Sequence, residues 1–390
     1  MFSSRFHWAA QHNRLTELLT AQRARGARVL DLTQSNPTRA GIVYPDELCR
    51  VFDDASVLHY DPLPAGSLAA REAVASYYRA RGHSVAPARI LLTASTSEAY
   101  SYLFKLLADP GDRVLVPRPS YPLFEYLARM ESVEVCQYPL EYHGGWAIDL
   151  DALARSITPR TRAIVLVNPN NPTGSYVKRG ELETLTRLAA ERGIALISDE
   201  VFSDYAFAGD ANRVTSLAGV EECMAFSMSG LSKIAGLPQM KLGWIVVSGP
   251  ARLRAEAIEK LEWIADTYLS VGAPVQCAAA RLLDAGGAVR RQIRERTAAN
   301  LTFARESVAG TALEILPVEG GWSVTVRVPR IRGEEEWCID LLDRASVLVQ
   351  PGYFYDFESE AFLIASLLTA PAEFQEGIGR IVAQATALAT

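Results

Sequence analysis

The feature of this chain that most constrains its fold is an alternation of short apolar segments with longer amphipathic ones. The apolar segments have the length of strands and lie at 90–93, 113–116, 133–138, 162–167, 194–197, 224–227 and 243–247. Segments with apolar residues at helical spacing lie at 67–81, 97–108, 121–131, 149–156 and 181–192. Strands that are apolar along their whole length are buried on both faces of a sheet. We therefore predict an α/β fold, with a mostly parallel sheet covered by helices on both faces.

The pattern changes on either side of this alternation. Residues 8–25 are typical of an amphipathic helix that ends at Gly26, and residues 253–268 and 274–308 are helical in pattern. A smaller α+β unit follows, with strands near 313–317, 322–328 and 347–349 and helices near 334–345 and 372–388. We predict an N-terminal arm at 1–45 that joins the small domain, a large domain at 46–275 and a small domain at 276–390.

Composition excludes several classes of protein. The 390 residues are 49% hydrophobic and 22% charged, which is the balance of a globular enzyme and not of a disordered or collagen-like chain. The formal net charge of −6 offers no global attraction to nucleic acid or to an anionic membrane. Five scattered cysteines without a CxxC pair indicate a reduced, cytoplasmic protein without a structural metal. The N-terminus lacks the pattern of a signal peptide, and no apolar stretch is long enough to predict a membrane helix.

Three polar segments directly follow predicted strands. Lys233 lies in a loop of small residues, an Asn- and Pro-rich segment occupies 168–174, and Asp199 with Glu200 ends another strand. Each has an ordinary interpretation by itself: a solvated lysine, a turn, and a helix cap. However, open α/β sheets bind ligands at the carboxyl ends of their strands, so the three segments are candidates for one site.

In this order and at this spacing, the segments resemble those of the class I/II aminotransferases, which are fold type I enzymes dependent on pyridoxal 5′-phosphate (PLP). The resemblance extends from about Asp31 to the C-terminus. It rests on Asn-Pro-Thr-Gly at 171–174, the acidic pair at 199–200 and the Ser-x-x-Ser-Lys stretch that ends at Lys233. It implies a sheet of the seven-stranded type between helices, together with a smaller α+β domain.

The resemblance also implies roles for individual residues. Lys233 would form the Schiff base with PLP and move the Cα proton, since a desolvated lysine amine is readily neutral and nucleophilic. Asp199 would pair with the pyridine nitrogen, and Asn171 would donate to the phenolic oxygen O3′. Tyr121 matches the aromatic residue that stacks on the pyridine ring.

Other positions match the phosphate contacts of the family. The loop before residue 97 would present hydroxyls and backbone N–H groups at a helix N-terminus, which favours a phosphate. The residues implied for the phosphate are Ser95, Thr96, Ser229, Ser232 and Lys241. Tyr60 matches the tyrosine that a neighbouring subunit contributes to the phosphate, which implies a homodimer with shared active sites.

Two departures from the family concern the cofactor. The family usually has a tyrosine three residues after the aspartate, where this chain has Phe202, which cannot donate to O3′. Losing that donor should raise the pKa of the lysine–cofactor linkage. The family commonly has an arginine eight residues after the lysine, where Lys241 keeps the charge without the bidentate geometry.

A third departure concerns the substrate. The family's arginine for the substrate α-carboxylate is replaced by Ile364, in an apolar strand. A carboxylate without a partner there would cost several kcal/mol. Two arginines are candidates to replace it: Arg39 in the N-terminal loop, where Asn36 is a further candidate substrate-binding residue, and Arg327, which we favour because a strand is more rigid than a loop.

The sequence therefore predicts a PLP-dependent aminotransferase that moves an amino group from an amino acid to a 2-oxo acid. A PLP-dependent carbon–sulfur lyase or another PLP enzyme of the same fold stays open, because the cofactor residues would be the same. A PLP-binding sensor without turnover is a further alternative, which the retained lysine, aspartate and asparagine disfavour.

Overall fold

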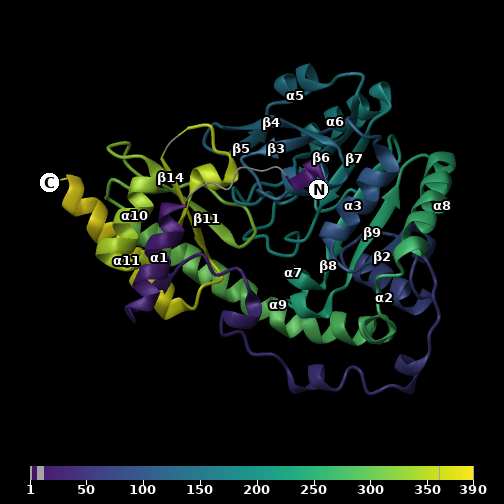
Figure 1. Cartoon of the computed structure of the whole chain (residues 1–390), viewed down its shortest axis with the longest axis horizontal. Coiled ribbons are helices and arrows are strands. Elements are labelled where there is room, and N and C mark those ends of the chain that lie inside the picture. Colours follow the sequence, from purple (N-terminus) through teal and green to yellow (C-terminus); the bar gives the residue numbers. More distant parts are fainter. Residues whose placement is uncertain (1, 7–12, 360, 390) are drawn as a thin grey trace.

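A computed structural model of the chain describes residues 2–6, 13–359 and 361–389. Figure 1 shows a large sheet with helices around it and a smaller α+β part beside it. Within the described residues the large sheet has eight strands. In spatial order they are β2 (Ile90–Thr93), β9 (Gly243–Ser248), β8 (Ala225–Gly230), β7 (Ala195–Asp199), β6 (Thr161–Val167), β3 (Arg113–Arg118), β4 (Glu134–Tyr142) and β5 (Trp146–Ile148).

The predicted α/β fold with a mostly parallel sheet is confirmed. Strands β4, β3, β6, β7 and β8 pair in parallel, whereas β9 is antiparallel to both of its neighbours. The resemblance implied a sheet of the seven-stranded type, whereas the observed sheet has an eighth strand. This strand, β5, pairs antiparallel with β4 and extends the sheet beyond it. Its three residues are too few to show an alternating pattern in the sequence.

Both faces of the large sheet are covered, as the apolar strands require. In β6, Val165 packs in one hydrophobic cluster and Ile164 in another, on the opposite face. The helices that pack on the Val165 face are α3 (Thr96–Leu107), α4 (Phe124–Met130) and α8 (Ala251–Tyr268). Those on the Ile164 face are α5 (Leu150–Ser156) and α6 (Arg179–Arg192), while α2 (Leu68–Arg79) and α9 (Ala273–Val308) pack against β2 and β9.

The smaller part has its own core and its own antiparallel sheet. This sheet has the order β10 (Glu314–Ile315), β11 (Ser323–Arg327), β14 (Phe362–Ser366) and β13 (Gln350–Pro351). The elements around it are α1 (Arg14–Ala24), α10 (Glu334–Ala345), α11 (Pro371–Ala389) and the pair β1 (Leu30–Asp31) with β12 (Val347–Leu348). Leu15, Leu30 and Leu32 lie in the same cluster as residues of α10 and α11. Figure 1 shows α9 running from the large sheet to this part.

Helix boundaries agree with the periodicity to within a few residues. The helix predicted at 8–25 is present as α1, and its positions 8–12 lie outside the described residues. Short 3₁₀ helices occur at Ser4–Phe6, Pro37–Arg39, Asp46–Cys49, Ala55–Leu58, Pro87–Arg89, Pro238–Met240 and Gly352–Tyr355. The five cysteines are free thiols. In the part of the chain that the structure describes, no helix is both long enough and apolar enough to cross a membrane.

Candidate active site

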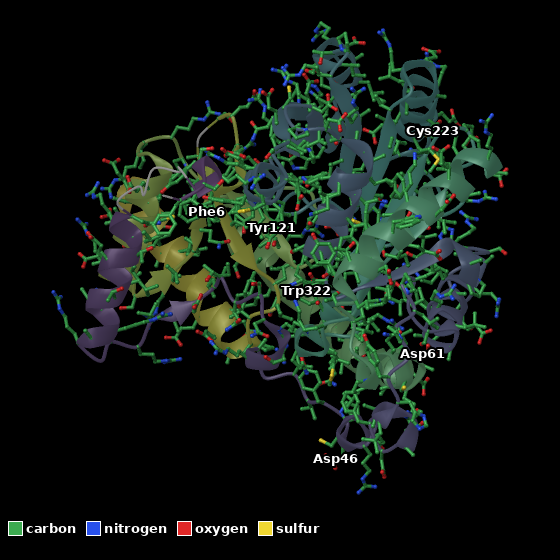
Figure 2. The ribbon with its side chains drawn as sticks, turned by 45° about the vertical axis from the view of Figure 1, so that its right-hand side comes forward. Phe6, Asp46, Asp61, Tyr121, Cys223 and Trp322 are labelled. Carbon is green, nitrogen blue, oxygen red and sulfur yellow. The ribbon has the colours of Figure 1, made fainter. Side chains whose placement is uncertain are left out.

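The three strand-end segments meet in one cavity of about 430 Å³. Asn171, Asp199 and Lys233 line it from the large sheet, and Trp322 and Ile364 line it from the smaller part. In Figure 2, Tyr121 and Trp322 are labelled near the junction of these two parts. The cavity thus lies at the carboxyl ends of the parallel strands, where ligands bind in open α/β sheets.

Strand register explains why these segments meet. Val167 at the end of β6 pairs with Asp199 at the end of β7, and Asp199 pairs with Met228 in β8. Strand β8 ends at Gly230, where an added Cβ would lie 2.8 Å from the carbonyl oxygen of Leu242. Only glycine fits this close approach. The short helix α7 (Leu231–Ile234), which contains Lys233, therefore begins directly after β8.

The Lys233 amine lies in a desolvated, aromatic environment. Its Nζ is 5.0 Å from the ring centroid of Trp322 and 5.7 Å from that of Phe202. Burial lowers the pKa of Lys233 from 10.5 to about 8, and the charge of Asp199 opposes this shift. The hydroxyl of Tyr205 donates to the Lys233 carbonyl oxygen at 2.6 Å, which holds the backbone of α7 in place.

The Asp199 carboxylate has two hydrogen-bond donors. Oδ1 accepts from the backbone N–H of Val201 at 3.2 Å, and Oδ2 accepts from the buried hydroxyl of Tyr100 at 3.2 Å. Burial raises the pKa of Asp199 from 3.8 to about 6, while these two hydrogen bonds and the charge of Lys233 oppose the increase. Asp199 is therefore mostly ionised at neutral pH and can hold a proton on a basic ring nitrogen.

Asn171 is oriented by the smaller part of the molecule. Its Oδ1 accepts from the Ser323 hydroxyl at 3.1 Å. Because this contact uses the amide oxygen, the amide N–H groups remain as donors toward the cavity. Phe202 also lines the cavity and brings no donor, as its identity predicts.

Several of the predicted phosphate residues lie close to one end of the cavity. Thr96, Ser97 and Ser232 line it, and Ser95 caps α3 by accepting from the backbone N–H of Glu98 at 3.2 Å. Ser229 is 1% exposed, and its Oγ has no hydrogen-bond partner among the described residues. A buried hydroxyl without a partner beside a helix N-terminus fits a phosphate acceptor. The residues present therefore fit PLP.

Five other predicted residues do not line the cavity: Lys241, Tyr60, Asn36, Arg39 and Arg327. Lys241 is exposed in a left-handed turn conformation with φ 51°, and Tyr60 is 81% exposed. Asn36 caps the short helix Pro37–Arg39, accepting from the Thr38 N–H at 3.0 Å, and Arg39 is exposed. Of the five, Lys241 lies just before β9, which pairs with β8, the strand that contains Ser229.

Arg327, which we favoured as the substrate-binding arginine, lies away from the cavity. It occupies the last position of β11, where it pairs with Glu314 in β10 and Phe362 in β14, and its guanidinium forms an ion pair with Glu314. Arg327 and Ser323 share one face of β11 but lie at opposite ends of the strand. Ile364 does line the cavity, so the position without the expected arginine faces the site.

Sequence reasoning missed three residues of the site. Tyr100 donates to Asp199, and its position one helical turn after Thr96 could have indicated that it faces the site. Trp322 covers Lys233, and its signal is the preceding Gly320-Gly321 pair, which allows a sharp approach of the chain. Gln350 also lines the cavity, and nothing in its local sequence distinguishes it from an exposed glutamine.

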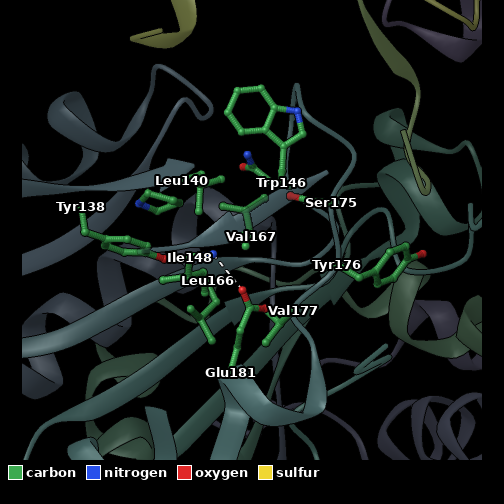
Figure 3. Close-up of a pocket in the computed structure, with 13 residues that line it drawn as sticks. Tyr138, Leu140, Trp146, Ile148, Leu166, Val167, Ser175, Tyr176, Val177 and Glu181 are labelled. Carbon is green, nitrogen blue, oxygen red and sulfur yellow. Dashed lines mark hydrogen bonds between the residues drawn. The ribbon is translucent and has the colours of Figure 1, made fainter. Parts of the chain in front are cut away.

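A second, smaller hollow lies between β4, β5 and β6, next to the chain after β6 (Figure 3). Its volume of about 20 Å³ has room for about one water molecule. Glu181 closes it by accepting from the backbone N–H of Ile148 at 2.7 Å, the dashed contact in Figure 3. This hollow is too small for a metabolite, and the candidate site is the cavity in which Asn171, Asp199 and Lys233 meet.

Comparison with known proteins agrees with this geometry. The profile of the family "Aminotransferase class I and II" matches residues 45–381, and the chain belongs to this family. Members of the class I and II family depend on PLP. The chain is 31% identical over 253 residues to the glutamate-pyruvate aminotransferase of Escherichia coli, and 29% identical over 263 residues to the alanine aminotransferase of Mycobacterium bovis.

These matches cover 64% and 65% of this chain but 62% and 59% of the two enzymes. Among solved structures, alanine aminotransferase from Pyrococcus furiosus superposes with a TM-score of 0.88 at 23% identity, covering 99% of this chain and 100% of that one. Aspartate aminotransferase from Thermus thermophilus, in a single-mutant form, gives a TM-score of 0.84 at 25% identity, with 98% and 99% covered. The fold of the whole chain is thus that of these aminotransferases.

Proposed function

We propose that the protein is a PLP-dependent aminotransferase. The observation that supports this most is the meeting of Lys233, Asp199 and Asn171 in one cavity, together with the buried Ser229 hydroxyl, which has no partner among the described residues. An amine, a carboxylate and a phosphate-binding helix end are the groups that a pyridine aldehyde phosphate requires. When bound, PLP would supply an electron sink for the negative charge that develops on the substrate carbon.

Lys233 would act as the attachment residue and as the group that moves the substrate proton. At its pKa of about 8, roughly a tenth of its amines are neutral at pH 7, against fewer than one in a thousand at 10.5. Trp322 and Phe202 keep water from the amine and so maintain this shift. Asp199 would hold the ring nitrogen protonated, Asn171 would donate to O3′, and Tyr121 would cover the ring.

The phosphate would be held by Ser95, Thr96, Ser229 and Ser232. Lys241 would contribute charge from the loop that follows, after a side-chain rearrangement, because it is exposed and does not line the cavity. In this arrangement no arginine from the described part of the chain reaches the cavity. The amino group would pass from a donor amino acid to a 2-oxo acid in two half-reactions at the same site.

We also propose a homodimer with shared active sites. Tyr60 is highly exposed and cannot serve its own cavity, as expected of a residue that serves a neighbouring subunit. Exposed apolar side chains on the chain around Tyr60, at the first residue of α2 and on α8 support a contact surface; they are Leu58, Leu63, Leu68, Trp263 and Tyr268. We also propose domain boundaries at about residues 45 and 275, which the separate core of the small part supports. A cytoplasmic location is a further proposal, which the free thiols support.

A single-turnover experiment tests the proposed function. Purified holoenzyme is mixed with a panel of amino donors, and the absorbance of the cofactor is followed together with the products. An aminotransferase converts the cofactor to its amine form and releases one equivalent of a carbonyl compound. A carbon–sulfur lyase releases a thiol from a sulfur amino acid and leaves the cofactor unchanged. Lys233→Ala is the matched control and should abolish both reactions.

A further inference from the structure

We propose that the cavity selects a substrate with an uncharged group on its reacting carbon, and that Gln350 recognises this group. One member of the substrate pair would then be a primary amine such as an amino acid amide, with the corresponding carbonyl compound as its product. This inference rests on the proposed amino-transfer function and names the substrate class of the same site. It goes beyond that function because an α-amino acid has a carboxylate at this position.

The first observation is the face that the small sheet turns toward the cavity. In the antiparallel register Gln350 pairs with Ile364, and Ser323 pairs with Ser366. Residues directly opposite each other in antiparallel strands have their side chains on the same face. All four line the cavity, and none carries a charge.

The second observation concerns the available cations. Lys233 is the one positively charged side chain among the described residues that line the cavity. The residues outside the described part include neither lysine nor arginine. Arg118, in the adjoining groove that shares Tyr121 with the cavity, forms an ion pair with Glu358. A substrate carboxylate in the cavity would therefore lack the cationic partner that its burial requires.

The third observation is that the two serine hydroxyls of this face that line the cavity already have partners. Ser323 donates to Oδ1 of Asn171, and Ser366 donates to the carbonyl oxygen of Gln34 at 2.6 Å. The hydroxyl of Tyr355 donates to Oε1 of Gln350. Since this contact occupies the amide oxygen, the amide N–H groups of Gln350 are available as donors to a substrate.

These contacts match an uncharged acceptor better than a carboxylate. A carboxylate has about four acceptor sites to satisfy, whereas a carboxamide or ketone oxygen has two. One neutral amide can serve the latter but leaves a buried carboxylate largely unpartnered. The neighbouring side chains Ile364, Phe354 and Trp322 are apolar or aromatic, and they suit the uncharged remainder of such a substrate.

The test compares two pairs of compounds that differ little except in charge. L-Alaninamide and L-alanine are offered to the holoenzyme, and the single-turnover conversion of the cofactor is measured for each. Isobutyramide and isobutyrate, which have no amino group and do not react, are titrated by calorimetry. We expect the amide to be preferred in both pairs by at least about tenfold. An acid that reacts and binds as well as its amide overturns the inference.

The two pairs separate this inference from the proposed function. If neither amine converts the cofactor but isobutyramide binds more tightly than isobutyrate, the amino-transfer function is wrong and the selection of uncharged groups stands. If conversion occurs with L-alanine in preference to L-alaninamide, the function stands and the inference is overturned. Failure of isobutyramide to bind at all also overturns it.

Variants of Gln350 assign the selection to this residue. Gln350→Glu keeps the shape but removes the N–H donors, and it should weaken isobutyramide binding about tenfold. Gln350→Arg supplies a cation and should shift the acid-to-amide preference toward the acid by about a hundredfold. Retention of cofactor and of the unfolding temperature shows that each variant is folded. If Arg118→Ala or Arg39→Ala weakens isobutyrate binding instead, an arginine serves the carboxylate and the inference is wrong.

Discussion

The hydrogen bond from Tyr100 to Asp199 should tune the charge of the carboxylate at the centre of the site. The change Tyr100→Phe removes only the hydroxyl, which lies 3.2 Å from Oδ2. A hydrogen bond to a charged acceptor contributes about 1.5 kcal/mol at this length, which corresponds to about one pKa unit. Because the lost donor stabilises the charged form, the pKa of Asp199 should rise from about 6 to about 7.

This shift has a defined effect on stability against pH. The pKa of Asp199 in the folded protein already lies above its ordinary value of 3.8, so folding stability decreases as pH rises through about 4 to 6. In Tyr100→Phe the decrease continues to about pH 7. The variant should therefore lose about 1.5 kcal/mol more than the wild type between pH 5 and pH 8. Burial keeps Tyr100 itself protonated throughout, since its pKa is raised well above 10.

The assay is the free energy of unfolding of the apoprotein in urea at pH 5 and pH 8, measured for the wild type and the variant. Tyr138→Phe is the matched control, because the Tyr138 hydroxyl is equally buried but donates to the carbonyl oxygen of Val165 at 2.8 Å. Its loss should be the same at both pH values. If Tyr100→Phe also loses equal stability at both, the hydroxyl does not stabilise the charged carboxylate and the reasoning is refuted.

Other predictions concern the cofactor, the subunits and the substrate. Lys233→Ala should prevent covalent capture of PLP, measured by intact mass after borohydride reduction; an adduct on another lysine would argue against its role. In the wild-type apoprotein the capture rate should rise about tenfold per pH unit and level off near pH 8, because burial lowers the pKa of Lys233; a plateau only near 10.5 would count against this desolvation. Phe202→Tyr should lower the pH midpoint of the bound cofactor's absorbance change by about one unit, since it adds a donor to the charged oxygen; an unchanged midpoint would mean that the added hydroxyl does not reach O3′. Mixing Tyr60→Phe with Lys233→Ala subunits should restore activity, and no recovery would contradict shared sites. Arg327→Ala should leave the kinetics unchanged, because its guanidinium is paired with Glu314; a raised KM for amino acids would revive its substrate role.

Local sequence predicted the regular elements well because their signals are local. The strand at 90–93 and the helix at 334–345 have the predicted bounds, since an apolar run and an amphipathic period need no distant partner to be recognised. The meeting of Asn171, Asp199 and Lys233 was also predictable, because the carboxyl ends of neighbouring parallel strands share one edge. The short strand β5 was not, since three residues show no period and depend on pairing with β4.

The sequence alone determined that this chain has a parallel α/β sheet with an amine, a carboxylate and an amide at one edge, and that the usual arginine is replaced by Ile364. Tertiary structure decided which side chains face the resulting cavity. Arg327 has the right strand and the right face, but pairing with β10 places it beside Glu314, away from the site. Gln350 has no local signal, and Tyr100 has only its position one helical turn after Thr96, yet register and helix packing bring their polar groups to the cavity and to Asp199. Contacts between residues far apart in the chain depend on how whole elements pack. Only the folded molecule therefore reveals that uncharged residues of the small sheet line the same cavity as Lys233.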